Sequence, residues 1–118
     1  MGSIYPGLDY QAYTAHGTAV LSILLSPDNG YGVTGFAPAA GCNYAPEYTQ
    51  QHAENAARAL LAGLTSGVIS TGDVQLMESQ TGGPSWDGMS DRGLVPTEWE
   101  PATFDAVRML TASGVVVV

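Results

Sequence analysis

The sequence predicts an α/β fold with three layers, in which helices cover both faces of a parallel β-sheet. Segments with a helical period alternate along the chain with short apolar segments that are typical of strands. Residues 50–66 carry one apolar face at helical spacing, and residues 115–118 are four consecutive valines, as in a parallel strand buried on both faces. This alternation implies right-handed crossovers within a single domain that spans residues 1–118.

The first helix is expected to begin at His16, Gly17 and Thr18. The run that follows is apolar on nearly all sides, so the helix should be buried. Pro27 should end it, and residues 28–30 (Asp-Asn-Gly) indicate a turn. A histidine at the opening of a buried helix lies at the positive end of the helix dipole, which disfavours imidazolium and leaves the ring available as a base.

The next three elements are a strand, a helix and a strand. Residues 41–48 alternate in part and predict a short strand that ends near Pro46. Residues 50–66 predict a helix, with Thr49 as its N-cap and Gly67 at its end. Residues 73–79 then predict a buried strand, and residues 85–96 predict a polar loop.

The last two elements are a helix and a strand. Thr97 and Glu100 match the capping-box pattern, and Pro101 falls in the first turn, where its missing N–H is tolerated. The helix should run to about residue 113 and end at Gly114. The residues that we expect it to bury are Phe104, Val107 and Leu110. Residues 115–118 should complete a sheet of three parallel strands, with residues 41–48 and 73–79.

Two sequence blocks in register resemble the histidine region of subtilisin-like serine proteases. The first block is His-Gly-Thr-Ala-Val at residues 16–20, and the second is Gly-Val-Thr-Gly-Phe-Ala-Pro at residues 32–38. The spacing between them matches the family without a gap. The resemblance implies a serine endopeptidase, a hydrolase that cleaves peptide bonds in a polypeptide substrate, with His16 as the general base of a Ser-His-Asp triad. The alternative is that His16 only begins a core helix.

The resemblance also implies a substrate-binding segment. Gln80, Thr81 and Gly82 stand where the family has a segment that pairs with the substrate backbone as an added strand. An ordinary Gly-Pro turn is the alternative interpretation of these residues. In several relatives the loop after the histidine helix wraps a calcium ion, and Asn29 falls where that loop supplies a side-chain oxygen. The N-terminal partners of that loop are absent, so we expect weak calcium binding or none, and no other metal or cofactor.

The 118 residues lack motifs that the family needs for catalysis. They contain neither the Asp-Ser/Thr-Gly motif of the acid nor the Gly-Thr-Ser motif of the nucleophile, and the segment with the oxyanion asparagine is also missing. The first hypothesis is therefore a fragment of a protease that is inactive by itself. The second is a small hydrolase in which His16 pairs with a local serine, and the candidates are Ser79, Ser85 and Ser90. The third is a non-catalytic binding or assembly module.

Composition limits the partners of the chain. Eleven acidic residues stand against three arginines and no lysine, so the net charge of −8 argues against binding to nucleic acid or to anionic membranes. No apolar run approaches the roughly 18 residues of a membrane span, and no signal peptide is visible at the N-terminus. Cys42 is the single cysteine, so the redox compartment and the localisation stay open.

Residues 115–118 also predict self-association. In the family this strand has a neighbour on each side, whereas here the sheet is expected to leave at least one edge unpaired. Natural edges are usually protected by lysine, proline or bulges, and this segment has none of them. We therefore expect a homo-oligomer, with residues 115–118 or the N-terminal segment in its interface.

Overall fold

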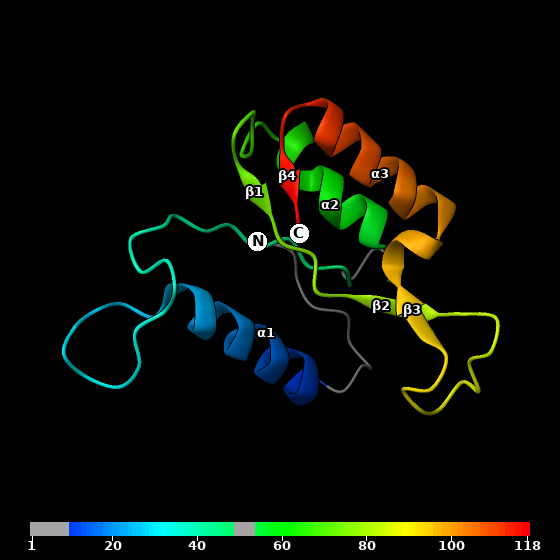
Figure 1. The fold of residues 1–118 in the computed structure, drawn as a ribbon, viewed down its shortest axis with the longest axis horizontal. Helices are drawn as coiled ribbons and strands as arrows, with labels where there is room; N and C mark the ends of the chain where they lie inside the picture. The colour runs from blue at the N-terminus through cyan, green and yellow to red at the C-terminus, as the bar shows by residue number, and fades with distance from the viewer. Residues whose placement is uncertain (1–9, 49–53) are drawn as a thin grey trace.

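The computed structural model describes residues 10–48 and 54–118, which form a small mixed α/β domain (Figure 1). Its helices are α1 (Tyr10–Leu25), α2 (Ala56–Thr65) and α3 (Pro101–Ala112), with a short 3-10 turn, η1 (Thr97–Trp99), before α3. Its strands are short: β1 (Val74–Gln75), β2 (Gln80–Gly82), β3 (Leu94–Pro96) and β4 (Val116–Val117). The predicted N-cap Thr49 and the first residues of the predicted 50–66 helix lie outside the described residues.

Helices α2 and α3 pack against each other and against one face of the sheet formed by β1 and β4 (Figure 1). The centre of this packing consists of Leu60, Ala106, Leu110 and Val115, all nearly inaccessible to solvent. Half-buried Met77 and Val117 pack against these residues from the same face of the sheet. Fully burying a leucine or valine side chain stabilises a fold by about 1.5–3 kcal/mol. The hydrophobic core around Leu60, Leu110 and Val115 is therefore the main source of stability among the described residues.

Strands β1 and β4 are parallel, which confirms that two of the three predicted strands, within residues 73–79 and 115–118, share a parallel sheet. Val74 is opposite Val116, and Gln75 is opposite Val117. The N–H of Val116 donates to the Asp73 carbonyl at 2.9 Å, and the N–H of Met77 donates to the Val118 carbonyl at 2.8 Å. The sequence predicted the strand at residues 115–118 because four β-branched residues follow a helix that ends at Gly114, whose φ is +81°.

The other predicted strand, residues 41–48, does not form. This segment is an extended loop, and its backbone carbonyls bond to α2 and the residue before it rather than to a strand. The carbonyls of Pro46 and Glu47 accept from Arg58, and the Glu47 carbonyl also accepts from the N–H of Asn55. The three-stranded parallel sheet of the prediction is therefore reduced to the parallel pair of β1 and β4.

A second pair of strands is antiparallel and was not predicted. Strand β2 pairs with β3, with Thr81 opposite Val95. Residues 85–96 were expected to be a loop throughout, but the last of them form β3. The loop between β2 and β3 requires glycine at position 93, just before β3. Gly93 has a φ of +82°, and a Cβ there would lie 2.6 Å from the backbone of Ser85.

The three-layer arrangement is not present among the described residues, because helices cover one face of the β1–β4 sheet. The opposite face carries four aliphatic side chains that are between 40% and 66% exposed: Val74, Leu76, Val116 and Val118. Helix α1 contributes no residue to the hydrophobic core and lies apart from α2 and α3 (Figure 1). A parallel sheet normally has both faces covered, so this apolar face is an unusual feature of the domain.

The capping patterns differ from the prediction at both later helices. Helix α2 begins six residues after Gln50, and the side chain of Asn55 is its N-cap, accepting from the N–H of Arg58 at 2.8 Å. Thr97 begins the 3-10 turn rather than α3, and its buried hydroxyl has no hydrogen-bond partner. Glu100 is the N-cap residue of α3, and Pro101 is its first residue, as the position of a proline in a first turn predicts.

Candidate functional site

His16 lies in the middle of α1 and not at its start. The helix begins at Tyr10, six residues earlier than predicted, so the argument from the helix dipole does not apply to His16. The side chain of His16 is exposed, and within the described residues it forms no hydrogen bond. The helix is also not buried as expected, because Ile23 on its later half is 59% exposed.

The second sequence block, residues 32–38, caps the C-terminal end of α1. The N–H groups of Gly35, Phe36 and Ala37 donate to the carbonyls of Ser26, Ile23 and Leu24, at 2.8, 3.0 and 2.7 Å. These carbonyls belong to the last turn of α1 and the residue just after it, and the last carbonyls of a helix have no partner within the helix. The two blocks at residues 16–20 and 32–38 therefore belong to one structural unit, a helix and the loop that returns to cap it.

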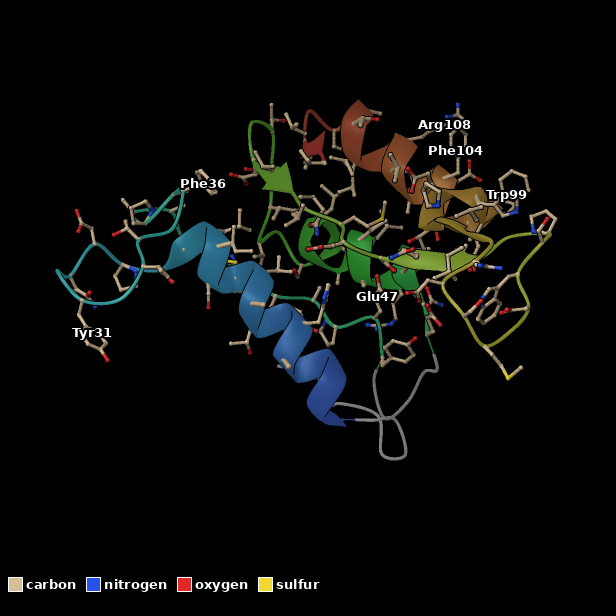
Figure 2. All side chains as sticks on the ribbon, turned by 60° about the horizontal axis from the view of Figure 1, so that its bottom comes forward. Tyr31, Phe36, Glu47, Trp99, Phe104 and Arg108 are labelled. Atoms are coloured by element: carbon tan, nitrogen blue, oxygen red, sulfur yellow. The ribbon has the colours of Figure 1, made fainter. Side chains whose placement is uncertain are left out.

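Gly35 is required at the point where the loop meets the helix. A Cβ at this position would lie 2.6 Å from the carbonyl carbon and oxygen of Leu24 and from the nitrogen of Leu25. These are backbone atoms, so they cannot move aside as a side chain can. The aromatic residues near Gly35 are not buried: Tyr31 and Phe36 are 88% and 90% exposed, and both project from the loop (Figure 2).

Asn29 is engaged within its own turn. Its side-chain oxygen accepts from the N–H of Tyr31 at 3.1 Å. In the residues that the structure describes, no group of three or more His, Cys, Asp or Glu side chains is placed to hold a metal ion.

The three residues predicted to bind substrate form strand β2. Because Thr81 and Val95 are opposite each other and the N–H of Gly83 donates to the Gly93 carbonyl, the backbone groups of Gln80 and Gly82 face away from β3. These groups are the ones that an added strand would use. The Trp86 ring packs directly over Gly82, closer than any Cβ on this residue would allow.

The loop between β2 and β3 is braced by Asp87. Its carboxylate accepts from the N–H groups of Met89 and Ser90 and from the Ser90 hydroxyl at 2.6 Å. The Ser90 hydroxyl, followed by these backbone N–H groups, lowers the pKa of Asp87 to about 2. The Trp86 ring nitrogen donates to the Ser90 carbonyl at 2.8 Å, so this loop holds the indole in place beside β2.

The three local serines are not brought to His16. The hydroxyl of Ser79 donates to Glu47 at 3.0 Å, and that of Ser90 donates to Asp87. Ser85, the third candidate, makes no side-chain hydrogen bond within the described residues. No pair of imidazole and hydroxyl is therefore formed in the part of the chain that the structure describes.

A cluster of carboxylates around the start of β2 is the feature that sequence reasoning missed. Glu47 accepts from Ser79, the residue before β2, and Glu100 accepts from Thr81 within β2 at 2.7 Å. Burial raises the pKa of Glu47, the Ser79 hydroxyl partly opposes this rise, and the negative charges of Glu54 and Glu100 add to it. The sequence predicts Glu47 within a strand at residues 41–48, and an acid in a weakly alternating segment does not indicate this cluster.

No helix among the described residues is long and apolar enough to cross a membrane. Comparisons with family models, with curated proteins and with solved structures each found no match for the chain.

Proposed function

We propose that the chain is part of a subtilisin-like serine endopeptidase domain, which hydrolyses peptide bonds in a polypeptide substrate. The observation that carries this proposal is the joint folding of the two sequence blocks. The block at residues 32–38 caps the helix that carries His16, and Gly35 is needed for that contact. The bonds join this loop to Ile23, Leu24 and Ser26, at the end of the helix that carries His16, so both blocks lie in one structural unit, which supports the proposal.

In this proposal His16 is the general base. It takes the proton of a serine hydroxyl as the serine attacks the peptide carbonyl, and it returns the proton to the leaving amine. The serine and the acid that orients the imidazole come from segments other than residues 1–118, because their motifs are not in this sequence. The exposed position of His16 supports this arrangement, since the imidazole is open to partners that the rest of the domain supplies.

Strand β2 binds the substrate in the same proposal. An extended peptide pairs with the backbone N–H and carbonyl groups of Gln80 and Gly82, and Thr81 stays paired with Val95 of β3. Backbone pairing of this kind gives affinity without selecting a side chain.

The three-layer fold belongs to this proposal as well. The exposed face formed by Val74, Leu76, Val116 and Val118 is the place for a second layer of helices, with α1 as one of them. Docking α1 there covers apolar side chains on both surfaces, which stabilises the domain by roughly 25 cal/mol for each Å² removed from water.

The isolated chain of 118 residues is expected to have negligible peptidase activity. It lacks the nucleophile and the oxyanion donor, and members of a catalytic triad act as a unit. A fluorophosphonate probe and a chromogenic peptide test this expectation. Labelling of Ser79, Ser85 or Ser90, together with turnover that is lost in His16→Ala, would contradict it and would favour the small hydrolase with a rebuilt site.

The second candidate function is a homo-oligomeric assembly module, and the exposed sheet face favours it. Two copies that bring together the faces formed by Val74, Leu76, Val116 and Val118 remove this apolar surface from water. Sedimentation at micromolar concentration is expected to show a dimer or a larger species. Leu76→Glu should reduce association, whereas Glu78→Gln, on an exposed neighbour, should not. A monomer that persists on concentration would contradict this candidate.

A further inference from the structure

The asparagines of the chain differ in the residue that follows each of them. The sequence contains three, Asn29, Asn43 and Asn55, and only the first precedes a glycine. Asn29 and Gly30 are both exposed, in the loop that leads from α1 to residues 32–38 (Figure 1). Asn43 precedes an aromatic residue, and Asn55 precedes Ala56, which is buried at the start of α2. The backbone nitrogen after Asn29 is therefore the least hindered of the three.

The side chain of Asn29 is held over the peptide group that follows it. Its Oδ1 atom accepts from the N–H of Tyr31 at 3.1 Å. The ring that this hydrogen bond closes includes the side-chain carbonyl carbon of Asn29 and the backbone nitrogen of Gly30, so these two atoms are kept near each other. Gly30 has a φ of +75°, and among the described residues nothing lies within 4 Å of the position of a Cβ there. The approach of the nitrogen to the carbonyl carbon is therefore open.

The hydrogen bond from Tyr31 also makes this carbonyl carbon a better electrophile. An N–H that donates to a carbonyl oxygen withdraws electron density from the carbon and stabilises the negative charge that forms on the oxygen during attack. A nucleophile that is held beside its electrophile reacts without the entropic cost of bringing the two together. The turn at Asn29 thus holds the two reacting atoms together and activates one of them.

We propose that Asn29 is a site of spontaneous deamidation, at which the backbone nitrogen of Gly30 displaces ammonia from the asparagine side chain. The Gly30 nitrogen forms a bond to the side-chain carbonyl carbon and gives its proton to the leaving amide nitrogen, whose bond to that carbon breaks. Ammonia departs and a cyclic imide remains. Water then adds to either carbonyl of the imide and breaks the bond from that carbonyl to the ring nitrogen, which yields isoaspartate or aspartate. Water is the co-reactant, and no atom changes its oxidation state.

A second turn with a similar backbone arrangement carries an acid in place of the amide. Asp87 precedes Gly88, whose φ is +81°, and the Asp87 carboxylate accepts from the N–H of Met89 at 2.9 Å. The Ser90 hydroxyl, followed by backbone N–H groups, lowers the pKa of Asp87 to about 2, so this carboxyl group is ionised at neutral pH. An ionised carboxylate resists attack by a nucleophile. We therefore expect that Asn29 forms the imide and that Asp87 does not.

Deamidation changes both the charge and the backbone of the loop. Either product adds one negative charge to a chain whose net charge is −8. Isoaspartate also places the Cβ of residue 29 in the main chain, which lengthens the turn and moves the N–H of Tyr31 away from its acceptor. Tyr31 projects from this loop, so the change alters an exposed part of the surface (Figure 2). The reaction goes beyond the proposed peptidase role, in which neither Asn29 nor Gly30 takes part.

Peptide mapping by mass spectrometry tests the proposal on the full chain, incubated at mildly alkaline pH. Exchange of the side-chain amide for a carboxyl group raises the mass of the peptide that contains Asn29. A protein-isoaspartate methyltransferase with a labelled methyl donor marks the isoaspartate product. We expect both signals at Asn29 before either appears at Asn43 or Asn55, and no methyl label at Asp87.

Gly30→Ala and Tyr44→Gly separate the two contributions to the rate. Gly30→Ala hinders the attacking nitrogen, so we expect ammonia loss at Asn29 to slow by about tenfold, which corresponds to about 1.4 kcal/mol in the activation free energy. Tyr44→Gly is the matched control. It gives Asn43 a glycine successor, but within the described residues the Asn43 side chain makes no hydrogen bond, so its rate should stay below that of Asn29.

Three results would overturn the proposal. The first is an Asn29 that keeps its amide throughout the incubation, and the second is an unchanged rate in Gly30→Ala. The third is an Asn43 that reacts as fast in Tyr44→Gly as Asn29 does in the unaltered chain, because the turn would then play no part. None of these results bears on peptide hydrolysis, so the proposed function is tested separately.

Discussion

Replacing Leu110 with alanine is expected to lower the free energy of unfolding by about 2–5 kcal/mol. Leu110 is completely inaccessible to solvent and lies at the centre of the cluster that joins α2, α3 and β4. Removing its branched side chain loses apolar burial and leaves a cavity that the short strands around it cannot easily fill. Domains of this size are commonly stable by only about 5–15 kcal/mol, so this single change is a large part of the total.

Met109→Ala is the control for Leu110→Ala. Met109 is the adjacent residue of the same helix, but it is 53% exposed. A change on the exposed face should alter the free energy of unfolding by no more than about 0.5–1 kcal/mol. Denaturant unfolding followed by far-ultraviolet circular dichroism measures both variants. Equal losses for the two would mean that the face of α3 carrying Leu110 is not the one that holds the domain together.

Replacing Gly35 with alanine is expected to detach the loop that caps α1. The added Cβ would stand 2.6 Å from backbone atoms of Leu24 and Leu25, and overpacking of this kind costs about 1–3 kcal/mol. The capping bonds from Phe36 and Ala37 contribute roughly 0.5–1.5 kcal/mol each, and they would be lost if the loop moved away. The end of α1 should then fray, with exposure of its last carbonyls to water.

The effect of Gly35→Ala should be local. Because α1 adds no residue to the hydrophobic core, the denaturant midpoint of the α2–α3 unit should change little. Amide exchange at Phe36 and Ala37 is the informative measurement, and their protection should fall. Gly41→Ala is the control, since nothing lies within 4 Å of a Cβ at that position. Unchanged protection in Gly35→Ala, or an equal fall in Gly41→Ala, would contradict the role given to Gly35.

The elements that the sequence predicted correctly are those whose local signals agree with their packing. The strand β4 was predicted from a β-branched run that directly follows a helix and a glycine turn, and β1 from an apolar segment that follows a turn. The boundaries of α3 follow from Pro101 at its first position and from Gly114 just beyond its end. Pro101 and Gly114 set these boundaries through their own backbone conformations, so the boundaries can be predicted without knowledge of distant contacts.

The errors arise where a distant contact decides the outcome. Residues 41–48 have a strand-like pattern, but Arg58 and Asn55 take the backbone carbonyls that a neighbouring strand would need. Strand β3 exists because Leu94 and Val95 find a partner in β2, after a turn that their own sequence does not indicate. Neither contact is visible as a period or a motif, because each joins residues that are at least eight positions apart in the chain.

The face that α3 buries differs from the predicted one. Phe104 was expected to be buried, but it is 51% exposed (Figure 2). The buried residues of this helix are Thr103, Ala106 and Leu110. Thr103, Ala106, Val107 and Leu110 follow the spacing i, i+3, i+4 and i+7 of one helix face, whereas Phe104 does not. The prediction followed the hydrophobicity of Phe104, but this residue lies off the helix face that contacts the core.

The sequence predicted some residues of the candidate site correctly and others not. Gln80, Thr81 and Gly82 do form a strand, since glycines on either side of the β2–β3 turn allow it to close. His16 was placed at the start of α1 because glycine and threonine follow it, but Gly17 is accommodated inside the helix. The carboxylate cluster of Glu47, Glu54 and Glu100 depends on three segments that meet in space, so no single stretch of sequence indicates it.

The measurement that tests the proposed function most directly is active-site labelling of a longer product, made from this chain together with its flanking coding sequence. We predict that a fluorophosphonate probe labels one serine outside residues 1–118. His16→Ala should reduce labelling and peptide turnover by several orders of magnitude, because a triad that lacks its base retains only binding and oxyanion stabilisation. Labelling that is unaffected by His16→Ala, or a longer product that neither reacts with the probe nor cleaves a peptide, would contradict the assignment of His16 as the general base of a subtilisin-like peptidase.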